Sequence, residues 1–206
     1  MEYVSNLMFW ISNGLLVPVI VGLLFFFFRA IFMLGGLFNQ YMSRSKQDKA
    51  LKKSLNELDK QNISTFKSIL EKTPSSKFTI AALQLYKEQN SAIHRNRQIS
   101  EFEINADKEL GKSKVLIKFG PILGLMGTLI PMGPALVGLS TGDIGSMAYN
   151  MQVAFATTVL GLCIGAAGFI LLQIRQRWVV SDLTNLDFIS DLMTQYKNET
   201  PCNEED

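Results

Sequence analysis

Charged residues are missing from three long stretches of this sequence of 206 residues, namely 3–28, 119–142 and 144–174. About 20 consecutive apolar residues cross a bilayer as a helix, whereas a soluble helix of that length normally carries a charged outer face. The sequence therefore predicts an all-α integral membrane protein with three transmembrane helices. We expect these helices at residues 7–28, 119–139 and 153–174.

Cysteine and histidine are also scarce, and no charge of one sign prevails. Two cysteines are too few for a disulfide framework, and a single histidine excludes a multi-histidine metal site. The net charge of +2 gives no basic excess of the kind that nucleic-acid binding requires. Neither a phosphate-binding loop nor a nucleophile–base pair occurs. We therefore expect no enzyme, no cofactor, no metal and no nucleic-acid partner.

The basic residues that are present lie almost entirely between and after the predicted spans. Sixteen of the 20 Lys and Arg residues fall between Arg44 and Lys118, and three follow the third span. Basic residues stay on the cytoplasmic side of a membrane. This predicts an outer N-terminal tail with the first helix (1–38), a cytoplasmic segment (39–118), a short outer loop (140–152) and a cytoplasmic tail (175–206).

The cytoplasmic segment shows apolar residues at helical spacing, so we expect it to be helical. Breaks are expected at residues 62–64 and 73–76, where Asn, Ser, Thr and Pro gather. From Lys77 to Lys118 there is no proline and one glycine, which predicts a single long helix that continues into the membrane.

The second and third predicted spans carry small or compact residues three and four positions apart, which places them on one face of each helix. In the second span these residues are Gly120, Gly124, Gly127, Pro131, Pro134 and Gly138; in the third span they include Ala154, Gly161, Gly165 and Gly168. Membrane helices associate by close backbone approach through such residues. We expect these two helices to pack tightly, within one chain or between copies, and the first helix to lie outside them.

Three threonines accompany these faces: Thr128, Thr157 and Thr158. Their hydroxyls can bond along or across membrane helices, or they can form a polar lining that faces a central cavity. Thr128 precedes Pro131 by three residues and is placed to help satisfy the backbone group that a proline leaves free.

The runs GPILGLMGTLIPMGP (120–134) and AFATTVLGL (154–162) resemble the MotA/TolQ/ExbB proton-channel family. Three predicted spans and the chain length make the ExbB/TolQ-like branch the more similar one. The resemblance implies a pentamer around a central pore, and a single-span partner of the ExbD/TolR/MotB type whose aspartate carries protons. The pore threonines of the family correspond to Thr128 and Thr158.

The sequence departs from the family pattern early in the third span. The ExbB/TolQ pattern has a glutamate at a position that Val153 occupies here, beside the neutral Gln152. Cys163 is then the only titratable side chain in the second and third spans, and a thiol in apolar surroundings stays neutral. The chain can line a proton path, but a carboxylate must come from another subunit.

We accordingly expect a pore-forming ring subunit of a two-component, proton-driven complex in a prokaryotic cytoplasmic (inner) membrane. Its N-terminus is expected outside and its C-terminus in the cytoplasm. A passive oligomeric scaffold and a self-sufficient ion channel are the alternatives. Transport of Na⁺ instead of H⁺ stays open, as do the partner and the process that the complex powers.

Overall fold

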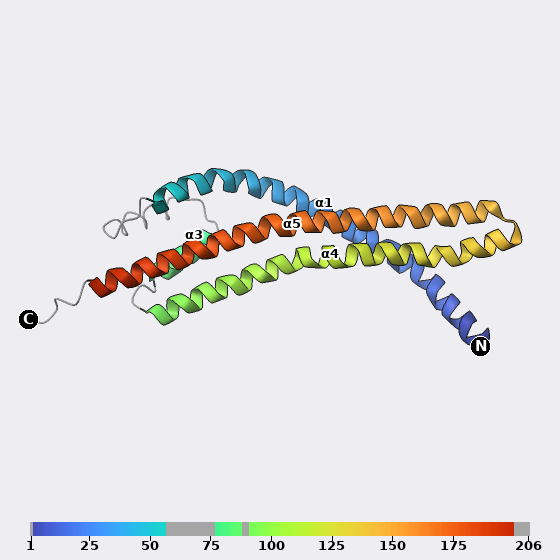
Figure 1. The fold of residues 1–206 in the computed structure, drawn as a ribbon, viewed down its shortest axis with the longest axis horizontal. Helices are drawn as coiled ribbons and strands as arrows, with labels where there is room; N and C mark the ends of the chain where they lie inside the picture. Colours follow the sequence, from blue (N-terminus) through green and yellow to red (C-terminus); the bar gives the residue numbers. More distant parts are fainter. Residues whose placement is uncertain (1, 57–76, 88–90, 200–206) are drawn as a thin grey trace, which may run out of the picture. The chain divides into compact units, whose positions relative to one another are not determined.

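The computed structural model describes residues 2–56, 77–87 and 91–199, and it is helical throughout its elements (Figure 1). The helices are α1 (Glu2–Asn56), α3 (Lys77–Lys87), α4 (Ala92–Thr141) and α5 (Ile144–Glu199). Three of them are long and apolar enough to cross a membrane, over Leu7–Met42, Ala92–Thr141 and Ile144–Gln195. The predicted fold class, all-α with three membrane spans, is confirmed. The breaks expected at residues 62–64 and 73–76 lie outside the described residues.

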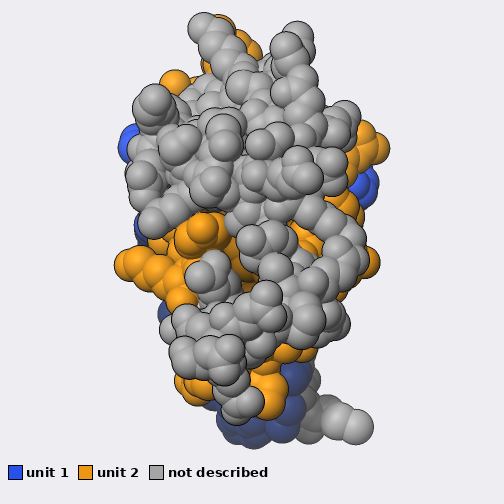
Figure 2. All heavy atoms as spheres, turned by 90° about the vertical axis from the view of Figure 1, so that its left-hand side faces the viewer, with its two compact units in different colours: residues 1–37, 111–173 blue, residues 38–110, 174–206 orange. Residues whose placement is uncertain are grey.

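The chain divides into two compact units, coloured separately in Figure 2. Unit 1 comprises residues 1–37 and 111–173, and unit 2 comprises residues 38–110 and 174–206. Unit 1 therefore holds the charge-poor parts of α1, α4 and α5. Unit 2 holds α3 and the charged parts of the same three long helices.

A small hydrophobic core organises unit 2. Helix α3 buries one face because its apolar residues recur at helical spacing, and this face meets α5. The buried members are Phe78, Ala82, Leu85, Leu186, Ile189 and Met193, with Ile99 and Phe102 of α4 packed against them. An ion pair between Lys77 and Glu109 adds a link from α3 to α4.

The single helix expected over residues 77–118 is wrong, because α3 ends at Lys87 and α4 begins at Ala92. Ser91 precedes the first turn of α4 as its N-cap. Its hydroxyl oxygen accepts from the backbone N–H of His94 at 3.4 Å, and its carbonyl accepts from the N–H of Arg95 at 3.1 Å. A serine side chain that bonds a free backbone N–H of the first turn favours a helix start, even where no glycine or proline marks a break.

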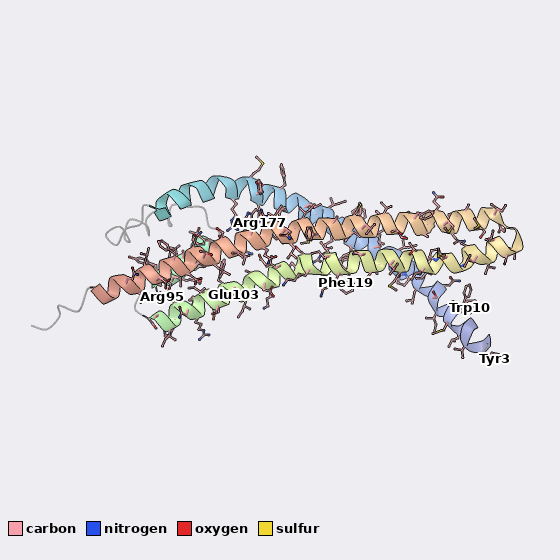
Figure 3. All side chains as sticks on the ribbon, in the orientation of Figure 1. Tyr3, Trp10, Arg95, Glu103, Phe119 and Arg177 are labelled. Atoms are coloured by element: carbon pink, nitrogen blue, oxygen red, sulfur yellow. The ribbon has the colours of Figure 1, made fainter. Side chains whose placement is uncertain are left out.

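Arg95 is buried in unit 2, although its neighbours in the sequence are polar (Figure 3). Only 2% of its surface is exposed. Its guanidinium donates to the hydroxyls of Ser190 at 3.3 Å and Thr194 at 2.5 Å, both on α5. The side chain therefore joins the start of α4 to the end of α5.

Helices α4 and α5 are joined by a turn of two residues, Gly142 and Asp143. Gly142 has a φ of 78°, and the N–H of Asp143 reaches the carbonyl of Gly138 at 2.8 Å, as in a Schellman motif. Asp143 then caps α5, because its carboxylate accepts from the N–H of Ser146 at 3.0 Å. Most of the loop expected at 140–152 is consequently helical.

Candidate pore-forming hairpin

Glycines bring α4 and α5 into backbone contact in unit 1. A Cβ added at Gly161 of α5 would lie 2.7 Å from the carbonyl oxygen of Gly120 and 2.7 Å from the Cα of Gly124, both on α4. One at Gly120 would lie 2.9 Å from two backbone atoms of α5. The same crowding occurs at Gly168, where an added Cβ would lie 2.8 Å from the Cβ of Leu116. The two helices thus pack within one chain, at a separation that a larger side chain would not permit.

Nearer to the turn, the contact is between a glycine and a threonine. A Cβ at Gly127 would lie 2.6 Å from the Cβ of Thr157, which is 5% exposed. The hydroxyl of Thr157 is directed back along α5, within bonding distance of the carbonyls of Val153 at 3.1 Å and Ala154 at 2.9 Å. Thr157 therefore lies inside the helix contact, beside the buried Ala154.

The two prolines of the small-residue face lie inside α4 without ending it. Pro131 is fully buried, and Pro134 is half-buried. We expected the Thr128 hydroxyl to help satisfy the backbone group that Pro131 leaves free, and this expectation is wrong. The hydroxyl donates to the carbonyl of Leu125 at 2.7 Å, not to that of Gly127, the carbonyl that Pro131 leaves without its helical donor.

Helix α1 contacts another side of α4. The rings of Phe26 and Phe119 stack with centroids 5.9 Å apart. Further along, a Cβ added at Gly22 would lie 3.8 Å from the side chain of Leu123, and one at Gly133 would lie 3.7 Å from the ring of Phe9. These pairs run in opposite directions along the two helices, so α1 and α4 are antiparallel.

Thr128 and Thr158 lie on the opposite side of this hairpin. Thr128 follows Phe119 by nine residues, about 2.5 turns, and therefore faces away from α1. Gly127 and Thr157 mark the centre of the helix contact, and in two antiparallel right-handed helices the next residue of each turns to the same side. Both threonines are half-buried, between the helix contact and an open apolar surface that includes Leu125 and Leu162, each 60% exposed.

The open side of the hairpin offers hydroxyls but no strong acid or base. Thr158 donates to the carbonyl of Ala154 at 3.0 Å, so its oxygen, like that of Thr128, keeps lone pairs as acceptors. Val153, where the family pattern has glutamate, is half-buried. Within the described residues, Cys163 is a free, exposed thiol, and no group of three His, Cys, Asp or Glu side chains could hold a metal ion.

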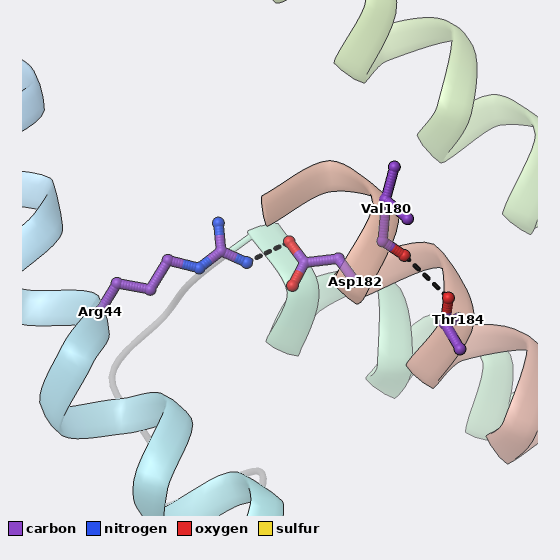
Figure 4. A network of polar contacts seen from close by, with 4 residues as sticks. All are labelled: Arg44, Val180, Asp182 and Thr184. Atoms are coloured by element: carbon purple, nitrogen blue, oxygen red, sulfur yellow. Dashed lines mark hydrogen bonds and ion pairs between the residues drawn. The ribbon is translucent and has the colours of Figure 1, made fainter. Parts of the chain in front are cut away.

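A polar and aromatic cluster in unit 2, which we name the Arg44 cluster, was not predicted from the sequence. Arg44 of α1 pairs with the buried Asp182 of α5 (Figure 4). The Arg44 guanidinium also lies 5.2 Å from the ring centroid of Trp178. Tyr41 stacks on the same Trp178, with centroids 6.2 Å apart. Tyr and Trp are enriched at membrane–water interfaces, so their presence near the ends of two apolar spans was the only signal available.

Replacing Arg44 with Gln should destabilise unit 2 by about 1–3 kcal/mol, because a charged hydrogen bond to a buried carboxylate is lost. Lys at this position should recover part of the loss, since it keeps the charge but cannot make the planar stack. Denaturant unfolding followed by Trp fluorescence measures the effect. The control is Arg97→Gln, which breaks an exposed pair with Glu101 and should cost no more than about 0.5 kcal/mol. Equal effects of the two substitutions would contradict this assignment.

Comparison with known proteins gives one match. The model of the MotA/TolQ/ExbB proton channel family matches residues 42–186, which include the α4–α5 hairpin of unit 1 and three members of the Arg44 cluster, Arg44, Trp178 and Asp182. No curated protein and no solved structure matches the chain significantly.

Proposed function

The chain belongs to the MotA/TolQ/ExbB proton channel family, and from this premise we propose that it is the ring-forming subunit of a complex driven by the proton-motive force. It is a multi-pass membrane protein with three spans. In the proposed complex, several copies, five by analogy with the family, surround a membrane helix of a single-span partner of the ExbD/TolR/MotB type. Thr128 and Thr158 line the ion path, and Thr157 and the glycines hold the hairpin together.

The observation that carries this proposal is the chemistry of the open side of the hairpin. It presents two hydroxyls on an apolar surface, and the sequence places no carboxylate, amine or imidazole in residues 119–139 or 153–174. Threonine hydroxyls do not ionise in the physiological range, so this surface cannot carry a proton by itself. A partner aspartate at the level of the threonines would supply the missing proton carrier.

The hydrogen bonds of the threonines favour one protonation state of that aspartate. Both hydroxyl protons are engaged by carbonyls of their own helices, so the oxygens act as acceptors. A protonated carboxyl group has an O–H to donate to such an acceptor, whereas a carboxylate has none. The threonines thus stabilise the neutral aspartic acid inside the ring, the form that can cross an apolar surface at low cost.

We propose the orientation with the N-terminus outside and the C-terminus in the cytoplasm of a prokaryotic inner membrane. The distribution of Lys and Arg supports it, because residues 140–152 carry none. The available energy is modest: about 2.3 kcal/mol per charge for each 100 mV, and about 1.4 kcal/mol for each pH unit. Substantial work therefore requires several protons. Na⁺ in place of H⁺ would need oxygen ligands from the partner.

The test is proton flux through the assembled complex after Thr128 and Thr158 are both replaced by Val. Two hydrogen bonds worth about 1 kcal/mol each correspond to a loss of about tenfold or more in rate. The matched control is Thr184→Val, because Thr184 bonds the carbonyl of Val180 in the same way but lies in unit 2. Undiminished flux from an assembled double variant would remove both threonines from the mechanism.

A further inference from the structure

Arg29 is a lone charge in a long apolar part of α1. Residues 3–28 before it and 30–43 after it carry no charge. Its side chain is exposed, and so are Phe25 and Phe32, one turn away on either side, at 60% and 86%. Spacings of four and three residues place all three on one face of the helix. A cation thus lies on a surface whose aromatic side chains suit lipid.

The contact between α1 and α4 sets the depth of Arg29. Phe26 of α1 stacks on Phe119 of α4, and the two helices are antiparallel. Arg29 follows its stacked phenylalanine by three residues, so it lies level with Leu116, three residues before the other ring. Lys118 lies two residues, about 3 Å, from that level. The two cations are therefore at nearly one depth, where the charge-free part of α4 begins.

Arg29 and Lys118 also lie on the same side of the α1–α4 contact. Phe119 meets α1, and the next residue, Gly120, meets α5. Lys118, the residue before, is turned about 100° the other way and faces away from α5. On α1, Arg29 is likewise turned back from Phe26, by about 60°. Equal turns in two antiparallel right-handed helices lead to the same side, so both cations face away from α5.

Exposed apolar side chains continue this side toward the middle of the membrane. Phe25 is 60% exposed and Ile122 is 53% exposed, and each lies one helical turn farther into the span than the cation of its own helix. We name Phe25, Arg29, Lys118 and Ile122 the Arg29 surface. It is charged where the span begins and apolar farther in, which is the order of headgroup and acyl chain in a phospholipid.

The Arg29 surface has no counter-charge in unit 1. Neither Arg29 nor Lys118 makes an ion pair with any residue that the structure describes. The acidic residues of unit 1 are Glu2 and Asp143, which lie at the other end of the antiparallel helices, at the start of α1 and at the α4–α5 turn. A cation at the edge of the apolar layer is costly without a partner, so this surface calls for an anion from its surroundings.

We propose that the Arg29 surface binds the headgroup of an anionic phospholipid of the inner leaflet, with Arg29 and Lys118 on its phosphate and an acyl chain along Phe25 and Ile122. Basic sites between membrane helices on the cytoplasmic side bind such headgroups. The guanidinium of Arg29 can give a phosphate two parallel hydrogen bonds. The choice of leaflet rests on the orientation proposed above, whereas the binding itself does not depend on the proton path.

The bound lipid joins two helices whose own contact is loose. A Cβ added at Gly22 of α1 would lie 3.8 Å from α4, an ordinary van der Waals distance, whereas one at Gly161 would lie 2.7 Å from the backbone of α4. A phosphate held by Arg29 of α1 and Lys118 of α4 therefore adds a charged link where close packing is lacking.

Native mass spectrometry of the purified full chain, titrated with phosphatidylglycerol in detergent micelles, tests the proposal. Replacing both Arg29 and Lys118 with Gln should weaken binding about 25-fold, because each basic residue near an anionic lipid contributes a factor of about five. Arg29→Lys keeps the charge but loses the fork, so its affinity should lie between the two. If the double variant does not fold, Lys118→Gln alone should weaken binding about fivefold.

The matched control is Arg97→Gln together with Lys87→Gln. It also removes two exposed positive charges, but from unit 2, and should leave the affinity for phosphatidylglycerol unchanged. Phosphatidylcholine, whose headgroup is neutral, should bind the unchanged chain more weakly than phosphatidylglycerol. Inorganic phosphate should not displace the lipid at equal concentration, because it has no acyl chain to lie along Phe25 and Ile122.

Three outcomes would overturn the proposal. Equal affinity of the unchanged chain and the double variant would show that the lipid binds elsewhere. Equal affinity for the two lipids would show that the headgroup charge is not recognised. Displacement by inorganic phosphate at equal concentration would assign the cations to a soluble anion. Proton flux is measured separately, so normal flux with any of these outcomes would remove the lipid site and leave the proposed function standing.

Discussion

Gly161→Ala is expected to disrupt the α4–α5 hairpin and with it the assembly of the complex. The added Cβ would lie 2.7 Å from the carbonyl oxygen of Gly120 and 2.7 Å from the Cα of Gly124. Both are backbone atoms, so no flexible side chain can move aside. Overpacking typically costs about 1–3 kcal/mol, and we expect the upper end of that range or more. Denaturant unfolding in detergent micelles and size-exclusion chromatography measure the loss of stability and of assembly.

Gly111→Ala is the matched control for this prediction. It also replaces a helical glycine in unit 1, but its Cβ would meet no atom within 4 Å. Alanine favours a helix over glycine by about 1 kcal/mol, so the control should be unchanged or slightly more stable. An assembled Gly161→Ala variant as stable as the control would show that the backbone contact is not required.

Gly127→Ala should also destabilise the hairpin, and a second substitution should reverse the effect. The new Cβ would lie 2.6 Å from the Cβ of Thr157 and 2.7 Å from its hydroxyl oxygen, at an expected cost of about 1–3 kcal/mol. Thr157→Gly removes both of these atoms. The double variant, with the bulk moved from α5 to α4, should therefore be more stable than Gly127→Ala alone.

A double-mutant cycle on the free energy of unfolding measures this coupling. Residues in contact typically give an interaction energy of about 0.5–3 kcal/mol, whereas independent residues give additive effects. The same cycle with Gly111→Ala in place of Gly127→Ala should be additive. Additive losses for Gly127 and Thr157 would mean that these residues do not touch in the membrane.

The membrane spans could be predicted from the sequence because a bilayer acts on every residue of a helix. A charge is costly anywhere in the apolar layer, so its absence over residues 3–28, 119–142 and 144–174 marks the spans directly. The packing faces that carry Gly120 and Gly161 could also be predicted, because close approach of two helices needs small residues at helical spacing. Both signals are local along the chain.

The remaining features depend on contacts between distant residues. Ser91 caps the start of α4, so α3 and α4 are separate helices although no glycine or proline marks the break between them. The partners of Arg44 and Arg95 are about 100 residues or more away, on α5. The difference between Thr157 and Thr158 arises because adjacent helical positions point about 100° apart, and which one meets α4 depends on Gly127.

The central claim is that this chain provides the wall of a proton path and that another subunit provides the proton carrier. Its most direct test is acidification of reconstituted vesicles under a membrane potential. The chain alone should give no flux above that of empty vesicles, and a single-span partner with an intramembrane aspartate should restore flux that an Asp→Asn change in the partner abolishes. Robust, proton-selective flux through vesicles that contain only this chain would contradict the claim.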